Sequence, residues 1–436
     1  MADIVIFYEL PERELNNANL LKAEFERRGY SVDIKDYWNY REVLFPIKEK
    51  PKLVIAQSGY DNNDLERFTI RFKPKIDKML DMRYEQVIAK RILNSSLHYP
   101  REYMKNMSHI CWSEHIQEEM MKQGIPKKNL PVTGDIKTDF SNKLFDSFYK
   151  TKEELGKEFN LDFTKEWILF ISSFTFNEDD SDYRLSRMNN SLEDGKYMQK
   201  WDIESKKIFM GWVEEFLKNH PEKEFIYRPH PVEYNVMSED LNMYVLEEKY
   251  PNFHYISKYA IQEWIRPCDY LNTILSTSII DVYLLNKQCN ILRPVPLNPD
   301  FDNPLLVNSN AIDNYSDFEK NNTHKNVDSF PVSDEVIHKY YYFGDKFAFE
   351  NICDYAEKMI NDDSFKADFY PNNITWLRLK YIIKRSLGMP KIIPKVLKSA
   401  FTNKSSSSKT EKDSIYAVNA DKIKKIVNSR SGNFEV

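Results

Sequence analysis

The sequence predicts an α/β protein with two successive halves, each built around a parallel β-sheet, followed by a helical extension. Short apolar runs alternate with amphipathic stretches over the first 140 residues, and the alternation resumes at Trp167 after a charged connecting passage. Strands and helices that alternate at this spacing are typical of βαβ units and parallel sheets. The length of 436 residues gives room for two or three domains.

In the first half, Leu20, Leu21 and Phe25 fall on one face of a helix that we expect to end at Gly29. A second helical pattern covers residues 68–79. Apolar runs predict strands at residues 4–8, 31–34, 52–56, 86–88, 109–112 and 130–133.

In the second half, Ile208, Trp212 and Val213 share one face of a predicted helix over residues 203–217. Two shorter helices are expected at 261–265 and 278–286. Strands are expected at 167–172, 225–227, 254–256, 270–275 and 290–292. Residues 174–200 form a polar loop in this interpretation, and residues 293–330 are irregular.

These elements give two Rossmann-like domains, expected over residues 1–150 and 160–330, with C-terminal helices over 331–400. The helices become basic from residue 376, and eight cations without an acidic residue occur between Trp376 and Lys404 among apolar side chains. Such a segment is typical of an interfacial amphipathic helix at a membrane, or of a helix packed back on the first domain. Residues 401–436 are expected to be a flexible tail.

The composition excludes several classes of protein. Lys and Arg number 62 against 67 Asp and Glu, a net charge of −5, so there is no global positive field for nucleic acid. The ten glycines never form GxGxxG or GxxxxGK[ST], which argues against a dinucleotide fingerprint or P-loop. The four widely spaced cysteines predict reduced thiols. Without a secretory or membrane-spanning pattern, we expect a cytoplasmic protein, soluble or peripheral on the inner face of the membrane.

The sharpest chemical signal is the motif RPHP, which presents Arg228 and His230 directly after a predicted strand. Ligands of open α/β sheets bind beyond the carboxyl ends of the strands. An arginine fork suits a phosphate, and a histidine can donate to a second phosphate oxygen or move a proton. The alternative is a capped turn with a surface Arg and His.

Two groups of hydroxyls follow other strands of the same half. Ser276, Thr277 and Ser278 precede a predicted helix, where they form either a phosphate site or an ordinary N-cap. Ser172 and Ser173 close another strand and are a candidate third wall of the site.

The RPHP motif and the STS motif about 45 residues later resemble the HP and S motifs of GT-B glycosyltransferases that build bacterial surface polysaccharides. The resemblance is to sialyltransferases and Kdo transferases that use CMP-activated acidic sugars. CDP-glycerol and CDP-ribitol phosphotransferases have a comparable layout. The segments at 7–15, 84–86, 112–114 and 132–135 are similar to the family of surface carbohydrate biosynthesis proteins. The resemblance spans about residues 3 to 295 and implies a GT-B fold, with two Rossmann-like domains facing each other across a cleft.

In such enzymes the HP histidine and the S-motif hydroxyls hold the donor phosphate, which implies this role for His230, Ser276, Thr277 and Ser278. Asp281 stands where many nucleotide-sugar enzymes place a Glu that binds ribose. A carboxylate of the first domain usually serves as general base. Our candidates for the base are Glu14 and then Glu85.

The resemblance implies no metal and no cofactor besides the donor. One departure is the acidic-acidic-glycine triplet of sialyltransferases, whose only match here is Glu193-Asp194-Gly195, in the second half.

The expected function is transfer of a sugar from a nucleotide-activated donor, CMP-Kdo or a CMP-nonulosonate, to a growing surface polysaccharide. The expected partners are that donor and a glycan or lipid-linked glycan acceptor, with membrane contact through residues 376–404 and no nucleic acid. The alternatives are a CDP-polyol phosphotransferase, a non-catalytic GT-B scaffold that binds glycan, and a sugar-nucleotide epimerase.

Overall fold

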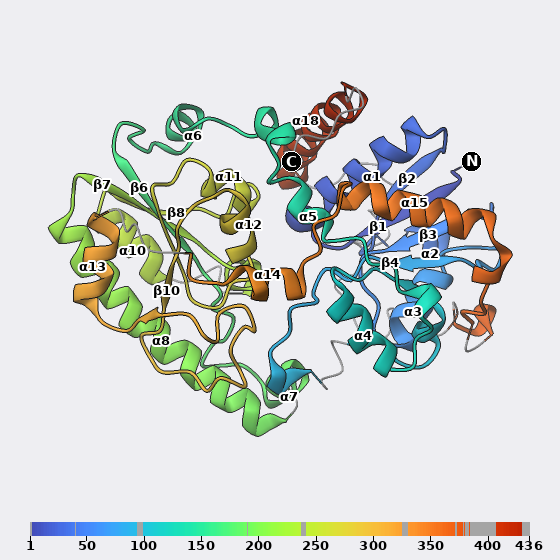
Figure 1. The fold of residues 1–436 in the computed structure, drawn as a ribbon, viewed down its shortest axis with the longest axis horizontal. Helices are drawn as coiled ribbons and strands as arrows, with labels where there is room; N and C mark the ends of the chain where they lie inside the picture. The colour runs from blue at the N-terminus through green and yellow to red at the C-terminus, as the bar shows by residue number, and fades with distance from the viewer. Residues whose placement is uncertain are drawn as a thin grey trace. The chain divides into compact units, whose positions relative to one another are not determined.

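The computed structural model describes residues 2–39, 41–93, 99–189, 191–236, 241–324, 330–370, 373–377, 379, 383 and 407–429. The chain divides into two compact units, whose elements are labelled in Figure 1. Unit 1 comprises Met1–Gln86, Tyr99–Asp139 and Lys339–Val436, and unit 2 comprises Val87–His98 and Phe140–His338. The division after Asp139 differs from the expected end of the first domain at residue 150, and most of the C-terminal helical region belongs to unit 1.

Unit 1 contains a five-stranded sheet in the order β2-β1-β3-β4-β5, and every neighbouring pair is parallel. The carboxyl ends of the strands therefore lie at one edge of the sheet. The strands are β1 (Ile4–Tyr8), β2 (Val32–Asp36), β3 (Leu53–Ala56), β4 (Met79–Asp81) and β5 (Ser108–His109).

The first helix of unit 1 ends as its sequence predicts. Gly29 adopts a φ of 92°, and the amides of Gly29 and Tyr30 donate to the carbonyls of Glu26 and Phe25, which satisfies the last turn of the helix. The α-helices of this unit are α1 (Asn16–Arg27), α2 (Arg41–Leu44), α3 (Asn62–Thr69), α4 (Glu114–Lys122), α5 (Ile136–Asp139), α15 (Ala348–Asn361) and α18 (Ser407–Ser429). Shorter turns are η1 (Pro11–Leu15, a π-helix), η3 (Glu102–Asn106), η4 (Lys127–Asn129) and η6 (Asp363–Phe365).

Three predicted elements of unit 1 are wrong. The helix expected at 68–79 lies earlier, because Asp61 accepts hydrogen bonds from the amides of Asn63 and Asp64 and so starts α3 at Asn62. Residues 86–88 do not form the expected strand. The strand in this part of the chain is β4, at Met79–Asp81, where Leu80 is fully buried. Residues 130–133 contribute only an isolated bridge to the chain next to β5.

Unit 2 contains a six-stranded parallel sheet in the order β11-β10-β9-β6-β7-β8. The central strand β6 pairs with β7 on one side and with β9 on the other. The strands are β6 (Glu166–Ile171), β7 (Lys223–Arg228), β8 (Phe253–Tyr255), β9 (Tyr270–Thr273), β10 (Asn290–Leu292) and β11 (Ala311–Ile312).

The long helix α8 (Leu192–Asn219) packs along this sheet (Figure 1). Phe209 lies against Phe170 of β6 with ring centroids 4.1 Å apart. The other helices of the unit are α6 (Lys152–Phe159), α7 (Asp182–Met188), α9 (Pro231–Val236), α10 (Leu241–Lys249), α11 (Ile261–Ile265), α12 (Ile279–Leu284) and α13 (Tyr315–Thr323), with turns η2 (Lys90–Ile92) and η5 (Lys143–Phe148); α14 (Asp334–Tyr340) crosses the boundary between the units.

Two stretches of unit 2 that we expected to be irregular contain helices. Ser191 caps α8 (Leu192–Asn219) by accepting from the amide of Asp194, so α8 begins well before the predicted residue 203 and follows a further helix, α7. Asn314 caps α13 in the same way, accepting from the amide of Asp317.

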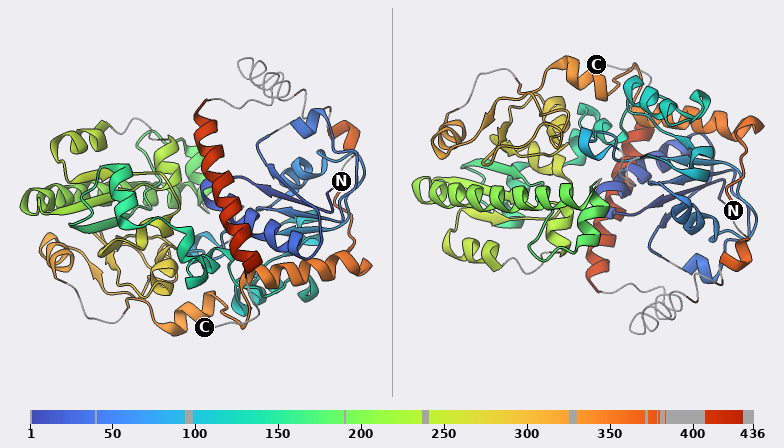
Figure 2. Two further views of the ribbon diagram at one scale, coloured as in Figure 1. Left: turned by 90° about the horizontal axis from the view of Figure 1, so that it is seen from above. Right: turned by 90° about the horizontal axis from the view of Figure 1, so that it is seen from below.

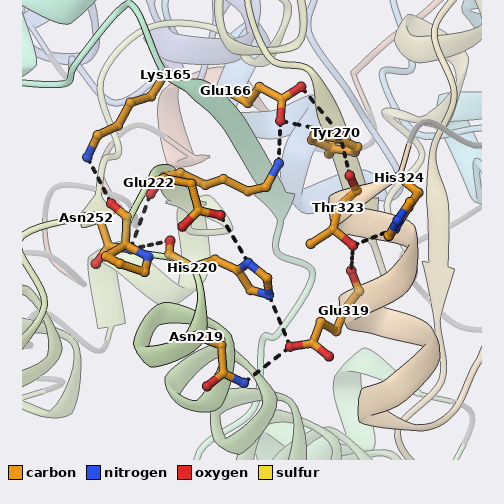
Figure 3. Close-up of polar contacts among 12 residues, drawn as sticks. Lys165, Glu166, Asn219, His220, Glu222, Asn252, Tyr270, Glu319, Thr323 and His324 are labelled. Carbon is orange, nitrogen blue, oxygen red and sulfur yellow. Dashed lines mark hydrogen bonds and ion pairs between the residues drawn. The ribbon is translucent and has the colours of Figure 1, made fainter.

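A polar network closes the amino-terminal edge of this sheet (Figure 3). His220, which follows α8, contacts Glu222 and Glu319 through its two ring nitrogens, each at 3.1 Å. Lys223 of β7 pairs with Glu166 of β6. These contacts join the end of α8 to α13 and to the starts of the central strands.

The predicted flexible tail is wrong for the described residues 407–429, which form α18. Ile423, Ile426 and Val427 are buried, and α18 lies against α1 (Figure 2). Lys424 also pairs with Glu26 at 3.0 Å. Spacing of three and four residues places these apolar side chains on one helix face. Three apolar residues within a polar stretch were too weak a pattern to predict a helix.

Of the basic segment at 376–404, only residues 376, 377, 379 and 383 are described, and the expected membrane contact falls mostly outside the described residues. Within the part of the chain that the structure describes, no helix is both long and apolar enough to cross a bilayer.

Replacing Ile423→Ala should destabilise unit 1 by about 2 to 5 kcal/mol, because a fully buried isoleucine would leave a cavity between α18 and α1. Urea denaturation measures the change. The control is Val418→Ala on the exposed side of α18, which should stay within about 0.5 kcal/mol. Equal effects of the two substitutions would contradict this packing.

Candidate donor-binding and catalytic residues

Three of the predicted motifs follow neighbouring strands of unit 2. Ser172 follows β6, Arg228 ends β7, and Ile274 follows β9. Because these strands are parallel and adjacent, the three loops emerge at the same edge of the sheet. The hydroxyl of Ser173 accepts a hydrogen bond from the amide of Leu275 at 2.9 Å, so the loops after β6 and β9 are in direct contact.

Arg228 has structural partners. Its guanidinium donates to the main-chain carbonyl of Ile256 at 3.0 Å and to that of Tyr259. These bonds hold the loop that follows β8. The fork that we expected to bind phosphate is thus directed at main-chain carbonyls, and the structure gives Arg228 a bracing role.

His230 is oriented by its own main chain. Its Nδ1 accepts a hydrogen bond from the amide of Val232 at 3.2 Å. A ring nitrogen that accepts carries no proton, so the neutral imidazole has its proton on Nε2. The half-buried His230 therefore carries an N–H donor of the kind that a phosphate oxygen requires.

The hydroxyls of Ser276, Thr277 and Ser278 lie half-buried just before α12. Ser276 accepts from the amide of Ser278 at 3.1 Å. Ser278 occupies the N-cap position without a capping hydrogen bond from its side chain. The capping alternative for Ser276 or Thr277 is thus met in part, since the hydroxyl of Ser276 satisfies one main-chain amide at the start of the helix.

Asp281 is completely buried in α12. Its carboxylate accepts a hydrogen bond from Gln262 of α11 at 3.0 Å. The structure thus places this carboxylate between two helices, where it is not exposed to a ribose.

Two buried acids near the motifs were not predicted. Glu233 of α9 accepts the hydroxyl proton of Ser172 at 2.7 Å. Asp202 of α8 accepts from the amides of Thr175 and Phe176 at 3.0 and 2.9 Å, in the loop after β6. Burial raises the pKa of Asp202 to about 7, and the nearby Glu233 adds to the rise. Neither acid belongs to a recognisable motif, so the sequence carries no signal that would single them out.

The two candidate bases of unit 1 lie on either side of one arginine. Arg13 contacts Glu14 at 3.3 Å and Glu85 at 2.9 Å. Glu14 is only 1% exposed, and its other oxygen accepts from the amides of Glu9 and Leu10. Burial raises the pKa of Glu14. Glu85, in contrast, is 53% exposed.

The acidic-acidic-glycine triplet has a packing role in unit 2. A Cβ atom on Gly195 would lie 2.5 Å from the carbonyl oxygen of Leu185, so the glycine permits α7 to approach α8. Asp194 pairs with Arg91 at 3.0 Å. These contacts give Gly195 a packing role and Asp194 a pairing role within unit 2.

No family model and no curated protein matches the chain. Among solved structures, a variant of the wall teichoic acid polymerase TagF matches with a TM-score of 0.52 and 12% identity, over 83% of this chain and 89% of that chain. A protein of Listeria monocytogenes assigned as a UDP-N-acetylglucosamine 2-epimerase matches with a TM-score of 0.50 and 13% identity, over 85% and 100%. The chain has the GT-B fold, as the sequence predicted.

The substitution Asp202→Asn should remove a pH dependence of stability. The folded-state pKa of Asp202, about 7, lies above its ordinary value of 3.8, so the folded protein binds a proton that the unfolded chain lacks between these values. Stability from this group therefore falls as pH rises through that window. The Tm of the variant relative to wild type should rise between about pH 5 and about pH 8. A constant Tm difference across the series would contradict the shift.

Proposed function

We propose that this protein is a GT-B glycosyltransferase that acts without a metal and extends a bacterial surface polysaccharide from a nucleotide-activated sugar. The observation that carries the proposal is that His230, Ser173 and the hydroxyls of Ser276 to Ser278 follow three neighbouring parallel strands and so belong to loops at one edge of the unit 2 sheet. These groups are suited to a donor phosphate.

The transfer reaction requires hydrogen-bond donors at the phosphate of the nucleotide. When the bond between sugar and nucleotide breaks, negative charge accumulates on the departing phosphate. The Nε2 proton of His230 and the hydroxyl protons stabilise that charge more in the transition state than in the ground state. The favoured donor is CMP-linked, a Kdo or nonulosonate, because the two sequence motifs resemble those of enzymes that use such sugars.

A CDP-polyol phosphotransferase is the second candidate. The likeness of the fold to the wall teichoic acid polymerase TagF makes a polymer of this chemical type a reasonable alternative product. The two functions differ in whether the transferred group keeps a phosphate. If the protein does not bind nucleotides, the third candidate, a non-catalytic GT-B scaffold, is favoured.

For the general base we now favour Glu85 over Glu14. A base must reach the acceptor hydroxyl, and Glu85 is exposed whereas both oxygens of the buried Glu14 accept hydrogen bonds from its surroundings. We propose that Glu14 braces the chain after β1 and that Arg13 links it to the catalytic carboxylate.

The acceptor is proposed to be a glycan or lipid-linked glycan at the inner face of the membrane. Leu377 packs with Val43 and Ile70, while Trp376 and Leu379 are each more than half exposed. Exposed apolar side chains within a run of cations suit an anionic membrane surface.

Nucleotide binding should depend on His230. A ligand that binds only the folded state raises Tm, so CMP should stabilise the wild-type protein more than CDP, UDP, GDP or ADP, as measured by thermal shift. His230→Ala should strongly reduce the shift, because it removes one of the donors to the phosphate. The matched control is His324→Ala, an exposed histidine of unit 2 at the opposite edge of its sheet, which should keep it.

A CDP preference would favour the polyol phosphotransferase, and a UDP preference the epimerase. The absence of any nucleotide shift in the wild-type protein would leave the non-catalytic scaffold.

Glu85→Gln should lower kcat by about 10²- to 10⁴-fold, the usual contribution of a general base, while nucleotide affinity stays unchanged. Glu14→Gln should mainly lower Tm, because it weakens hydrogen bonds to a buried carboxylate. Initial rates of product formation and melting curves separate the two effects. A large loss of kcat in the Glu14 variant with full activity in the Glu85 variant would restore the original order of candidates.

A further inference from the structure

Glu233 is a carboxylate in an unusual position. It lies in the first turn of α9, three residues after His230, and is only 1% exposed. Carboxylates are rarely buried to this degree unless they are paired and hydrogen-bonded. Its burial beside the RPHP loop therefore requires an explanation.

The carboxylate collects donors from four separate elements. One oxygen accepts from the hydroxyl of Ser172 at 2.7 Å and from the amide of His230 at 3.2 Å. The other accepts from the hydroxyl of Tyr227 at 2.7 Å and pairs with Lys206 of α8 at 3.0 Å. Glu233 thus joins the loop after β6, strand β7, the RPHP turn and α8.

A count of protons assigns the role of Ser172. A serine hydroxyl has one proton, and here it points to a carboxylate that can only accept. The oxygen of Ser172 accepts from the amide of Phe174 at 3.3 Å. Its proton is therefore used within the protein, and Ser172 braces the site instead of donating to a phosphate.

The same carboxylate fixes the main chain of His230, and the amide of Val232 fixes its ring. Together they hold the Nε2 donor in one orientation. Lys206 also balances charge, because an unpaired carboxylate of Glu233 would repel a nearby phosphate. The contact with Lys206 offsets that charge.

We propose that Glu233 is the positioning residue of the donor-phosphate site, acting through His230, with Ser172, Tyr227 and Lys206 as its supports. This inference rests on the proposed function, because it assumes that His230 contacts the phosphate of a nucleotide. It assigns to Glu233 a role in ligand affinity that a residue important only for folding would not have.

The test is a double-mutant cycle on nucleotide affinity, with CMP, CDP and UDP each titrated calorimetrically. Glu233→Gln should raise the Kd at least about 10-fold in the wild-type background. In the His230→Ala background the same change should raise it less than about 2-fold, since the group that it positions is gone. An equal effect in both backgrounds, or none in the wild type, would overturn the inference.

The matched control is Glu224→Gln. Glu224 is another buried glutamate of the unit, in β7, paired with His254 at 2.6 Å and with Lys165 at 3.3 Å near the amino-terminal edge of the sheet. It should lower Tm and leave the Kd unchanged. A comparable rise of Kd in this control would show that any loss of a buried carboxylate weakens binding, and would overturn the specific role of Glu233.

If Glu233→Gln does not fold, Tyr227→Phe removes one donor to Glu233 and keeps the shape of the strand. Its effect on Kd should be smaller, about 2- to 5-fold, and should likewise vanish with His230→Ala. If the wild-type protein binds none of the three nucleotides, the proposed function fails and the inference with it. If His230→Ala weakens binding and neither Glu233→Gln nor Tyr227→Phe does, only the inference fails.

Discussion

The parallel pairing of β6 with both β7 and β9 is the constraint on which the candidate site depends. Ile171 is opposite Arg228 on one side and opposite Thr273 on the other, so the three strands end at one level. Residues separated by about a hundred positions then meet within a few loops, as the contact between Ser173 and Leu275 shows. A change of register by one residue would turn every side chain of the shifted strand to the opposite face and separate these groups.

Much of the fold was predictable because apolar runs and amphipathic faces carry it. Ile4–Tyr8, Asn290–Leu292 and Ile261–Ile265 begin and end where the sequence predicted. The failures have local causes. The strand Met79–Asp81 is only three residues long, too short for a periodic pattern. The helix expected at 68–79 begins earlier, at Asn62, because the cap at Asp61 sets its start.

The site was predictable in its location but not in the division of roles. The residue types in RPHP and STS indicate a phosphate site, and the strand ends place it. Which side chains serve the ligand depends on partners distant in sequence. Arg228 donates to the carbonyl of Tyr259, and Asp281 accepts from Gln262. No local sequence pattern predicts such pairings, because each forms only when the folded sheet brings distant segments together.

The charge balance beneath this edge of the sheet follows from the same geometry. Two buried acids, Glu233 and Asp202, lie near a site proposed for an anionic ligand, which would be unfavourable if both were charged and unpaired. Lys206 neutralises Glu233, and burial keeps Asp202 largely protonated below about pH 7. Hydrogen bonding therefore orders the loops without placing net negative charge under them. The arrangement reconciles a rigid support built from carboxylates with the binding of a phosphate.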